Sequence, residues 1–491
     1  MYSEVGYSNK YWPKSQPERR IIMKLTNEGA TQYEFSMDHA LEFFSKAGSL
    51  FENRKSFYGQ EESALGLFQK VWVVDPVISM KLLFWLRDCR GGAGNRSGAR
   101  AIYNWLGNTA PEWIEINIGW IPLVGRWDDL KALFGTKAEK AAAELWANAI
   151  KEKDILAAKW AKRDYYQIRK VLGLKIKPFR KLLASIRKNH IVEHKMCHNM
   201  WKEIEYEKVP SVAMARYTAA FNRHDEERFE KYKQALSEGK ATIHSDVLFP
   251  HDCVRTVFHG DKKIADAQFE ALPNFLEGTN EKIIVIADTS ASMDIHISGS
   301  VRAVYVSIGM ALYCSAKISE DNPFYKKFIA FCDEGNFKDW NGMKFSTAVR
   351  NEEIFDGAVG ATRIDKALMS ILDMAKFFNL KQDQMPTTLL IISDMQFHGA
   401  TRVRKDVPPI KACLEEFERV GYIPPKIVYW NTAGYAGSPE LAHETGVAMV
   451  SGFSSAILEN IFAGEDMSPI AVMNRTLEKY KIVDPRTNEE V

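Results

Sequence analysis

Five oxygen-bearing side chains have the types and spacing of a site for a hard divalent cation. Asp288, Ser290 and Ser292 occupy alternate positions of DTSAS (288–292), directly after the apolar run IIVIA (283–287). Two further ligands are offered by Thr362 in GATRID (360–365) and Asp394 in LLIISDMQF (389–397). Mg²⁺ prefers octahedral oxygen ligands and keeps several waters. Because this set carries little charge, a bound Mg²⁺ (or Mn²⁺) would stay electrophilic enough to accept one more carboxylate from outside.

The elements that must position these side chains are short strands alternating with helices. Continuous apolar runs predict strands, and the stretches between them predict helices over 301–318, 364–379 and 408–420. The predicted strands are 283–287, 328–331, 389–392, 427–430 and 447–450. Uninterrupted apolar strands that alternate with helices indicate a parallel, doubly wound α/β sheet covered on both faces. Ligands of such sheets bind beyond the carboxyl ends of the strands, which is where Asp288 and Asp394 fall.

The D-x-S-x-S motif, the separate threonine and the strand-end aspartate resemble the metal-ion-dependent adhesion site (MIDAS) of von Willebrand factor A domains. The resemblance covers about residues 280–460. It implies a Rossmann-like fold in which Ser290, Ser292 and Thr362 are direct ligands. It also implies that Asp288 and Asp394 hold the metal partly through waters.

The residues of this motif could instead cap a turn or belong to a different α/β fold. The two serines are also typical of residues that cap the turn after a strand. A haloacid-dehalogenase-type phosphatase would need a second aspartate at position 290, where the chain has Ser290. The G-x-G-x-x-G and P-loop motifs do not follow the first strand. Because no candidate general base accompanies a nucleophile, we expect a binding site and not an enzyme.

The N-terminal half has a different periodicity. From about residue 39 to 265, apolar residues recur at three- and four-residue spacing, which predicts an all-helical array. Segments 25–48, 85–96 and 121–130 resemble the TROVE module of the Ro autoantigen family, and 208–229 and 248–252 are most similar to a functionally unassigned branch of that architecture. The resemblance implies a HEAT-like, ring-forming helical domain that precedes a von Willebrand factor A domain. It also implies binding of small structured RNAs and single-stranded RNA ends.

Basic residues are concentrated where RNA binding would need them. Residues 159–195 contain twelve Lys/Arg and two acidic residues, with Tyr165, Tyr166 and Phe179 among them. Cationic side chains neutralise phosphates and aromatic rings stack on bases. The RNA-binding candidates in this stretch are Lys159, Lys162, Arg163, Arg169, Lys170, Lys175, Lys177, Arg180, Lys181, Arg187 and Lys188. A second set, Arg87, Arg90, Arg96, Arg100 and Arg126, brackets the loop GGAGNRSG (91–98).

Each basic set also has a structural interpretation. A basic helix face is often a solvated surface, and Arg87 could form an internal ion pair with Asp88. A zinc site is a weaker alternative in HIVEHKMCH (190–198), where His190, His194, Cys197 and His198 share one helix face. The H-E-x-x-H motif is absent there, so RNA contact or plain surface is favoured over zinc.

The composition of the chain indicates its compartment and the kinds of surface it can bind. The 491 residues carry a net charge of +2, so any polyanion-binding surface must be local. Six scattered cysteines without a CxxC pair favour a reducing compartment, and the polar N-terminus lacks an apolar signal region. The longest apolar run, 303–316, is shorter than the ~20 residues of a membrane span. We therefore expect a cytoplasmic monomer that is not bound to a membrane.

Together these patterns predict three parts. They are an N-terminal extension (1–38), a helical domain (39–270) and an α/β domain (275–491) whose C-terminal helix, about 468–481, packs back. The predicted function is an RNA-binding scaffold of Ro ribonucleoprotein type with a MIDAS for a protein carboxylate. The alternative is a metal-dependent protein–protein interaction module without nucleic acid. A metal-dependent hydrolase is a third hypothesis.

Overall fold

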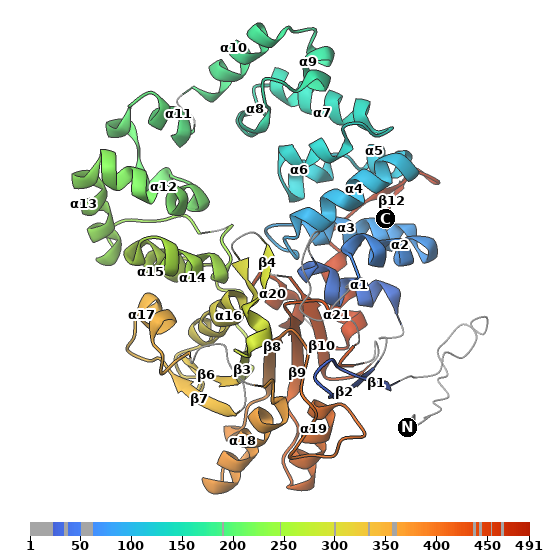
Figure 1. Ribbon diagram of the computed structural model, residues 1–491, viewed down its shortest axis with the longest axis vertical. Coiled ribbons are helices and arrows are strands. Elements are labelled where there is room, and N and C mark those ends of the chain that lie inside the picture. The colour runs from blue at the N-terminus through green and yellow to red at the C-terminus, as the bar shows by residue number, and fades with distance from the viewer. Residues whose placement is uncertain are drawn as a thin grey trace.

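The chain has a helical N-terminal half and a C-terminal half built on a six-stranded, mostly parallel sheet (Figure 1). This confirms the predicted division into an all-helical and an α/β region. The computed structural model describes residues 23–33, 38–50, 62–188, 191–245, 247–298, 301–331, 334–355, 361–435, 438–440, 444–452, 454–462 and 466–491.

Fifteen helices among the described residues form what we call the helical arch. Local signals start and stop them: the Asp75 side chain caps α3 by accepting from Ile78 N (3.0 Å), and Gly173 ends α9 with a left-handed φ of 66°. The first limb comprises α1 (His39–Lys46), α2 (Ala64–Val74), α3 (Pro76–Arg87), α4 (Arg96–Thr109), α5 (Pro111–Ile116), α6 (Trp120–Val124), α7 (Glu139–Lys151), α8 (Ile155–Trp160), α9 (Tyr166–Leu172) and α10 (Ile176–Arg187). The second limb comprises α11 (Val192–Cys197), α12 (Ser211–His224) and α13 (Glu226–Ser237), and α14 (Pro250–His259) and α15 (Lys262–Glu270) return to the sheet.

The sheet has the order β10-β9-β8-β3-β6-β7. Every described pairing is parallel except that of the edge strand β7 with β6. The strands are β3 (Ile283–Asp288), β6 (Lys327–Phe331), β7 (Gly335–Asp339), β8 (Thr388–Ser393), β9 (Lys426–Asn431) and β10 (Val447–Ser451). All residues of β3 and β8 are buried, as expected for central strands covered on both faces.

Four of the six described helices of this half match the predicted stretches, whereas α17 and α20 were not predicted. The six helices are α16 (Ala303–Lys317), α17 (Phe345–Arg350), α18 (Ile364–Phe377), α19 (Pro409–Arg419), α20 (Ile457–Phe462) and α21 (Pro469–Leu477). As predicted, the C-terminal helix packs back, against β10, α1 and α3. All five predicted strands are present, whereas the polar edge strand β7 was not predicted from apolar runs. Small antiparallel pairs, β1 (Met23–Leu25) with β2 (Thr31–Tyr33), β4 (His296–Ser298) with β5 (Val301–Arg302), and β11 (Val483–Asp484) with β12 (Glu489–Glu490), complete the described strands.

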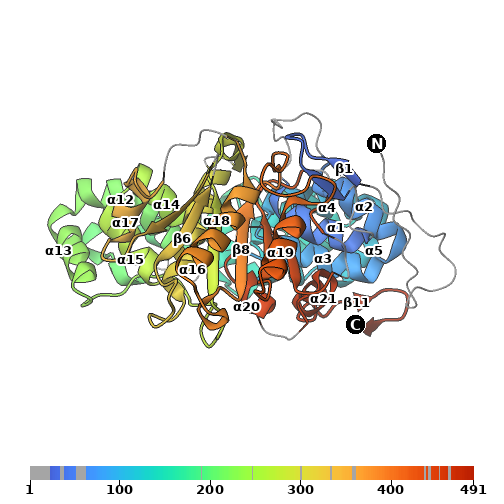
Figure 2. The same cartoon turned by 90° about the horizontal axis from the view of Figure 1, so that it is seen from below.

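Both ends of the helical arch rest on the α/β half. In Figure 1 the helices rise from α1 beside the sheet, cross the top at α8–α10 and descend through α11–α13 to α14 and α15. Seen from below in Figure 2, α1–α5 lie on one side of the sheet and α12–α15 on the other. At one contact a Cβ on Gly48 would lie 2.7 Å from Gly452 N, and at the other a Cβ on Gly309 in α16 would lie 2.8 Å from His251 N. Glycine is thus what allows the backbones to approach at each end.

The hydrophobic core is divided unevenly along the arch. One continuous cluster joins the first limb, the sheet and its helices, from Ala30 to Ile482. The second limb has a separate small cluster that runs from Ile204 to Ile264. Among the described residues, no helix has both the length and the apolar character needed to cross a membrane.

Candidate metal centre and basic surface

Four of the five predicted cation ligands lie at the carboxyl ends of β3 and β8, where the strand order reverses. β3 lies between β8 and β6 and is parallel to both, so the chain leaves its carboxyl end toward β6 and later returns on the other side. Connections that run in opposite directions open a crevice at the carboxyl ends of such strands. Asp288 ends β3, and Asp394 directly follows β8. Both side chains are fully buried.

The serines after β3 face this centre. Asp288 Oδ1 accepts from Ser290 N (2.9 Å), and Asp288 Oδ2 accepts from Ser393 Oγ (2.5 Å). The hydroxyls of Ser290 and Ser292 lie 3.1 Å apart. Ser290 precedes the 3₁₀ turn Ala291–Asp294, yet its side chain makes no capping hydrogen bond to the described amides of that turn. The capping interpretation of Ser290 therefore fails, and its hydroxyl is directed at the carboxyl cluster.

Thr362, the fifth predicted ligand, is hydrogen-bonded to the segment that follows Asp394. Its backbone N donates to His398 Nδ1 (2.8 Å), and its backbone O accepts from His398 N (3.0 Å). His398 belongs to the segment after Asp394, whose Oδ1 accepts from Gln396 N (3.0 Å). Thr362 is 2% exposed, so it is placed among buried groups next to the Asp394 loop.

The electrostatics of this cluster suit a cation. Burial raises the pKa of Asp288 to about 7, and the charge of Asp394 contributes to this increase. Two buried carboxyl groups at one site repel each other unless a proton or a cation offsets the charge. The hydroxyls of Ser290, Ser292 and Ser393 lie beside these carboxyl groups. The donor set is therefore entirely oxygen, which fits Mg²⁺ or Mn²⁺ and not a thiolate-preferring metal.

Nitrogen- and sulfur-rich metal sites are not found in the described part of the chain. No group of three or more His, Cys, Asp and Glu side chains converges among these residues. In the predicted zinc candidate, the rings of His194 and His198 stack with centroids 4.1 Å apart, and Cys197 is exposed. His190 lies outside the described residues. The described residues of this helix therefore form no zinc site.

An N-terminal segment that was not predicted to contribute lies against the centre. Thr26 Oγ1 donates to Phe397 O (2.6 Å), Asn27 Nδ2 donates to Gln396 Oε1 (3.0 Å), and Glu28 Oε2 lies 2.7 Å from His398 Nε2. The segment lies far from residue 397 along the chain. No local periodicity or motif signals such a contact, so analysis of the sequence missed it.

The basic stretch 159–188 keeps most of its charge on the surface. Eight of its cationic side chains are exposed and pair with no described carboxylate: Lys162, Arg163, Lys170, Lys175, Lys177, Arg180, Lys181 and Lys188. They belong to α9, α10 and their flanking loops, at the top of the arch in Figure 1. Arg169 is half-buried, with its guanidinium 5.8 Å from the exposed ring of Tyr166.

Several nominated residues have structural roles instead. Lys159 pairs with Glu193 across the two limbs (3.0 Å), and Arg187 Nε donates to Ala158 O (2.7 Å) at the end of α8. Phe179 is fully buried and Tyr165 is 8% exposed, so neither ring is available for stacking on a base. Helix amphipathicity explains the burial of these two rings, because apolar residues on one side of a helix pack into the core.

The arginine loop is mostly a structural network. Arg87 is 2% exposed and binds Asp129 through Nη2 (2.7 Å), so its nomination as an RNA contact is wrong, as is the suggested pairing with Asp88. Arg100 also binds Asp129, through Nε (2.6 Å). A buried guanidinium needs such a carboxylate partner. Of the nominated arginines in this set, Arg90 and Arg96 are exposed.

Two segments of the chain match known protein families. Residues 282–488 match a domain of unknown function, DUF7788, and residues 136–284 match a second domain of unknown function, DUF2828. The two matches meet where β3 begins. The chain is also 24% identical to an uncharacterised protein of Acanthamoeba polyphaga mimivirus, over 95% of this chain and 89% of that protein.

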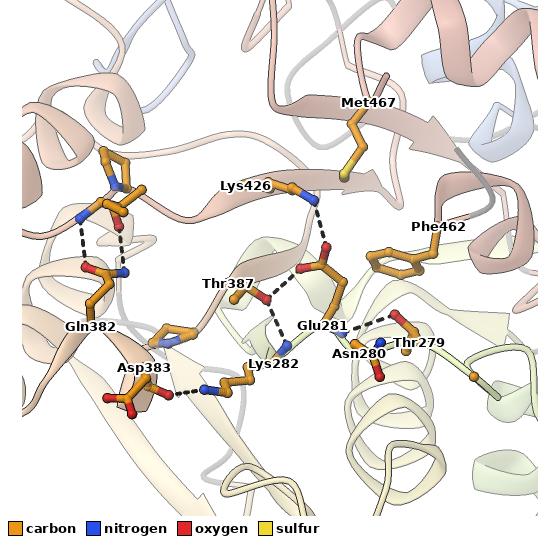
Figure 3. Close-up of a pocket in the computed structure, with 14 residues that line it drawn as sticks. Thr279, Asn280, Glu281, Lys282, Gln382, Asp383, Thr387, Lys426, Phe462 and Met467 are labelled. Atoms are coloured by element: carbon orange, nitrogen blue, oxygen red, sulfur yellow. Dashed lines mark hydrogen bonds and ion pairs between the residues drawn. The ribbon is translucent and has the colours of Figure 1, made fainter. Parts of the chain in front are cut away.

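A separate pocket of about 620 Å³ lies at the opposite, amino-terminal edge of the sheet (Figure 3). Glu281 is at its centre and accepts from Lys426 Nζ (2.7 Å) and Thr387 Oγ1 (2.5 Å). Lys282 Nζ donates to the backbone O of Asp383. Since these charged groups bind one another across the strand ends, we interpret them as fastening β3, β8 and β9 together and not as a ligand site.

Proposed function

We propose that this protein is an RNA-binding scaffold of Ro ribonucleoprotein type and not an enzyme. The observation that carries the proposal is the set of eight exposed cations on α9, α10 and their loops that pair with no carboxylate in the described part of the chain. Lysine and arginine side chains that neutralise phosphates release counterions, which favours binding of any nucleic acid strand. Tyr166, 59% exposed beside Arg169, adds one ring on which a base can stack.

Exposed cations without a carboxylate partner are more densely placed on α9 and α10 than on the second limb among the described residues. On the second limb, several exposed lysines are each held by a nearby carboxylate: Lys208 by Glu205, Lys231 by Glu227 and Lys240 by Glu238. Such surface pairs present little net charge to a polyanion. A solvated helix face of ordinary composition would resemble the second limb more than α9 and α10.

In the same proposal the α/β half is a von Willebrand factor A-type domain and the helical arch is a TROVE-like module. Asp288, Ser290, Ser292, Thr362 and Asp394 would hold Mg²⁺ or Mn²⁺. The bound ion would supply an electrophilic position for a carboxylate of a protein partner. The support is the all-oxygen donor set at the point of strand reversal and the repulsion between its two buried carboxyl groups.

The test removes charge from the top of the arch. Replacing Lys175, Lys177, Arg180 and Lys181 together by alanine should weaken binding of a single-stranded RNA oligonucleotide by roughly tenfold or more and flatten its salt dependence. The matched control replaces Lys208, Lys231 and Lys240, which are exposed but paired, and should leave affinity nearly unchanged. Fluorescence anisotropy across a salt series measures both. Equal losses in the two variants would contradict the proposal.

The second candidate function is a metal-dependent protein interaction module that binds no nucleic acid. The buried Asp288–Asp394 centre favours it, because that centre does not depend on the basic surface. It predicts that partner capture is lost with EDTA or in Asp394→Ala and is insensitive to the four basic substitutions. Ser370→Ala, which removes a hydroxyl on α18 that bonds only to its own helix in the described structure, is the control.

A further inference from the structure

The N-terminal segment Thr26–Ala30 is bound along the loop that follows Asp394. Gly399 N donates to Glu28 O (3.2 Å) and Ala30 N donates to Phe397 O (3.3 Å), which makes a short antiparallel contact. Thr26 and Asn27 add the side-chain bonds described above. The segment therefore buttresses the loop that carries one proposed ligand and contacts another.

Within this contact, three residues form a chain of hydrogen bonds that ends at a proposed ligand. Thr362 N donates to His398 Nδ1 (2.8 Å), so Nδ1 is the unprotonated nitrogen of the ring. The proton is then on Nε2, which donates to Glu28 Oε2 (2.7 Å). The Glu28 contact is then a hydrogen bond from an imidazole N–H to a carboxylate oxygen. Glu28 thereby selects the tautomer that can accept from Thr362.

We propose that Glu28 is a positioning residue for the cation site and couples docking of the N-terminal segment to cation occupancy. This inference rests on the proposed cation site. The His398 imidazole accepts from Thr362 N, and the His398 backbone N donates to Thr362 O. The backbone that carries the Thr362 hydroxyl therefore depends in part on the orientation of the imidazole. Glu28 and His398 side chains are 24% and 26% exposed, so water competes only partly for their bond. Cation binding requires an ordered Thr362, so it should favour docking of the N-terminal segment. By thermodynamic linkage, docking of the segment should raise the affinity for the cation to the same degree.

The experiment measures Mn²⁺ affinity of the full chain by electron paramagnetic resonance at fixed pH. E28A removes the acceptor and should weaken Mn²⁺ binding about tenfold or more, the range found for groups that orient metal ligands, whereas E28Q should stay within about threefold of wild type. Glutamine is expected to substitute because its Oε1 accepts from the same Nε2–H. T31A is the comparison: it removes a docking bond, Thr31 Oγ1 to Lys405 O (2.6 Å), without touching His398, and should weaken Mn²⁺ binding less than E28A does.

A second measurement does not depend on the stability of the variants. Hydrogen exchange of wild-type amides 26–30 and 397–399 should slow when Mg²⁺ is added. The inference is supported when E28A loses more Mn²⁺ affinity than E28Q and T31A do and wild-type exchange slows. It is overturned if E28A binds Mn²⁺ like wild type, if E28A, E28Q and T31A weaken binding equally, or if Mg²⁺ leaves exchange of the segment unchanged. Wild-type protein that binds no Mn²⁺ overturns the proposed cation site together with the inference.

Discussion

At the scale of single residues, Glu440 carries a buried carboxyl whose Oε1 accepts from the hydroxyl of Tyr429 (3.0 Å). Burial raises the pKa of Glu440 to about 8, and the charge of Glu444 contributes to this increase. The folded chain therefore holds a proton that the unfolded chain releases near pH 4.5. Between about pH 5 and 8 the free energy of unfolding should fall with rising pH, by up to about 1.4 kcal/mol per pH unit from this group.

Glu440→Gln should flatten that slope, because glutamine keeps an acceptor for Tyr429 and does not titrate. Urea unfolding at intervals from pH 5 to 9 measures the effect. The exposed Glu459 provides a control, and Glu459→Gln should retain the wild-type slope. If the free energy of unfolding depends on pH in the same way in wild type and in Glu440→Gln, another group determines the pH dependence.

At the scale of elements, the packing of α14 on α16 depends on Gly309. A Cβ at this position would lie 2.8 Å from both His251 N and Pro250 C, which are backbone atoms that cannot rotate away. Gly309→Ala should therefore destabilise the protein by about 1–3 kcal/mol, despite the better helix propensity of alanine.

Gly66 in α2 is the matched control for that substitution. A Cβ there would meet Ser63 Oγ at 3.4 Å and Glu62 Cγ at 3.6 Å, which are ordinary contacts. Gly66→Ala should leave stability unchanged or increase it by up to about 1 kcal/mol. Equilibrium unfolding of the two variants tests the comparison, and a stabilised Gly309→Ala would refute the proposed tight contact.

At the scale of the whole molecule, the α/β half closes an arch whose limbs differ in core size. The first limb shares one continuous core with the sheet, whereas the second limb has its own small cluster. Less buried apolar surface means a lower free energy of local opening. Native-state hydrogen exchange should therefore show earlier opening of α11–α13 than of α3 and α4. Equal protection of both limbs would mean that contacts between them, such as the Lys159–Glu193 ion pair, make the two limbs open as one unit.

Much of the architecture was predictable because it depends on local patterns. Apolar runs predicted all five parallel strands, and strand ends predicted where Asp288 and Asp394 would lie. The basic composition of 159–188 predicted an exposed charged stretch. Within it, however, Lys159, Arg187, Tyr165 and Phe179 turned out to serve the fold, because their neighbours come from other helices.

By itself the sequence determined the alternation of the five parallel strands with helices, the oxygen-rich character of the sheet edge and the sign of charge at the top of the arch. These follow from residue types and from periods of two and 3.6 residues. Only the tertiary structure decided that Arg87 binds Asp129 inside the first limb and that Glu28 reaches Thr362 through His398. Such pairs lie far apart along the chain, and which of them form depends on how whole elements pack around one core.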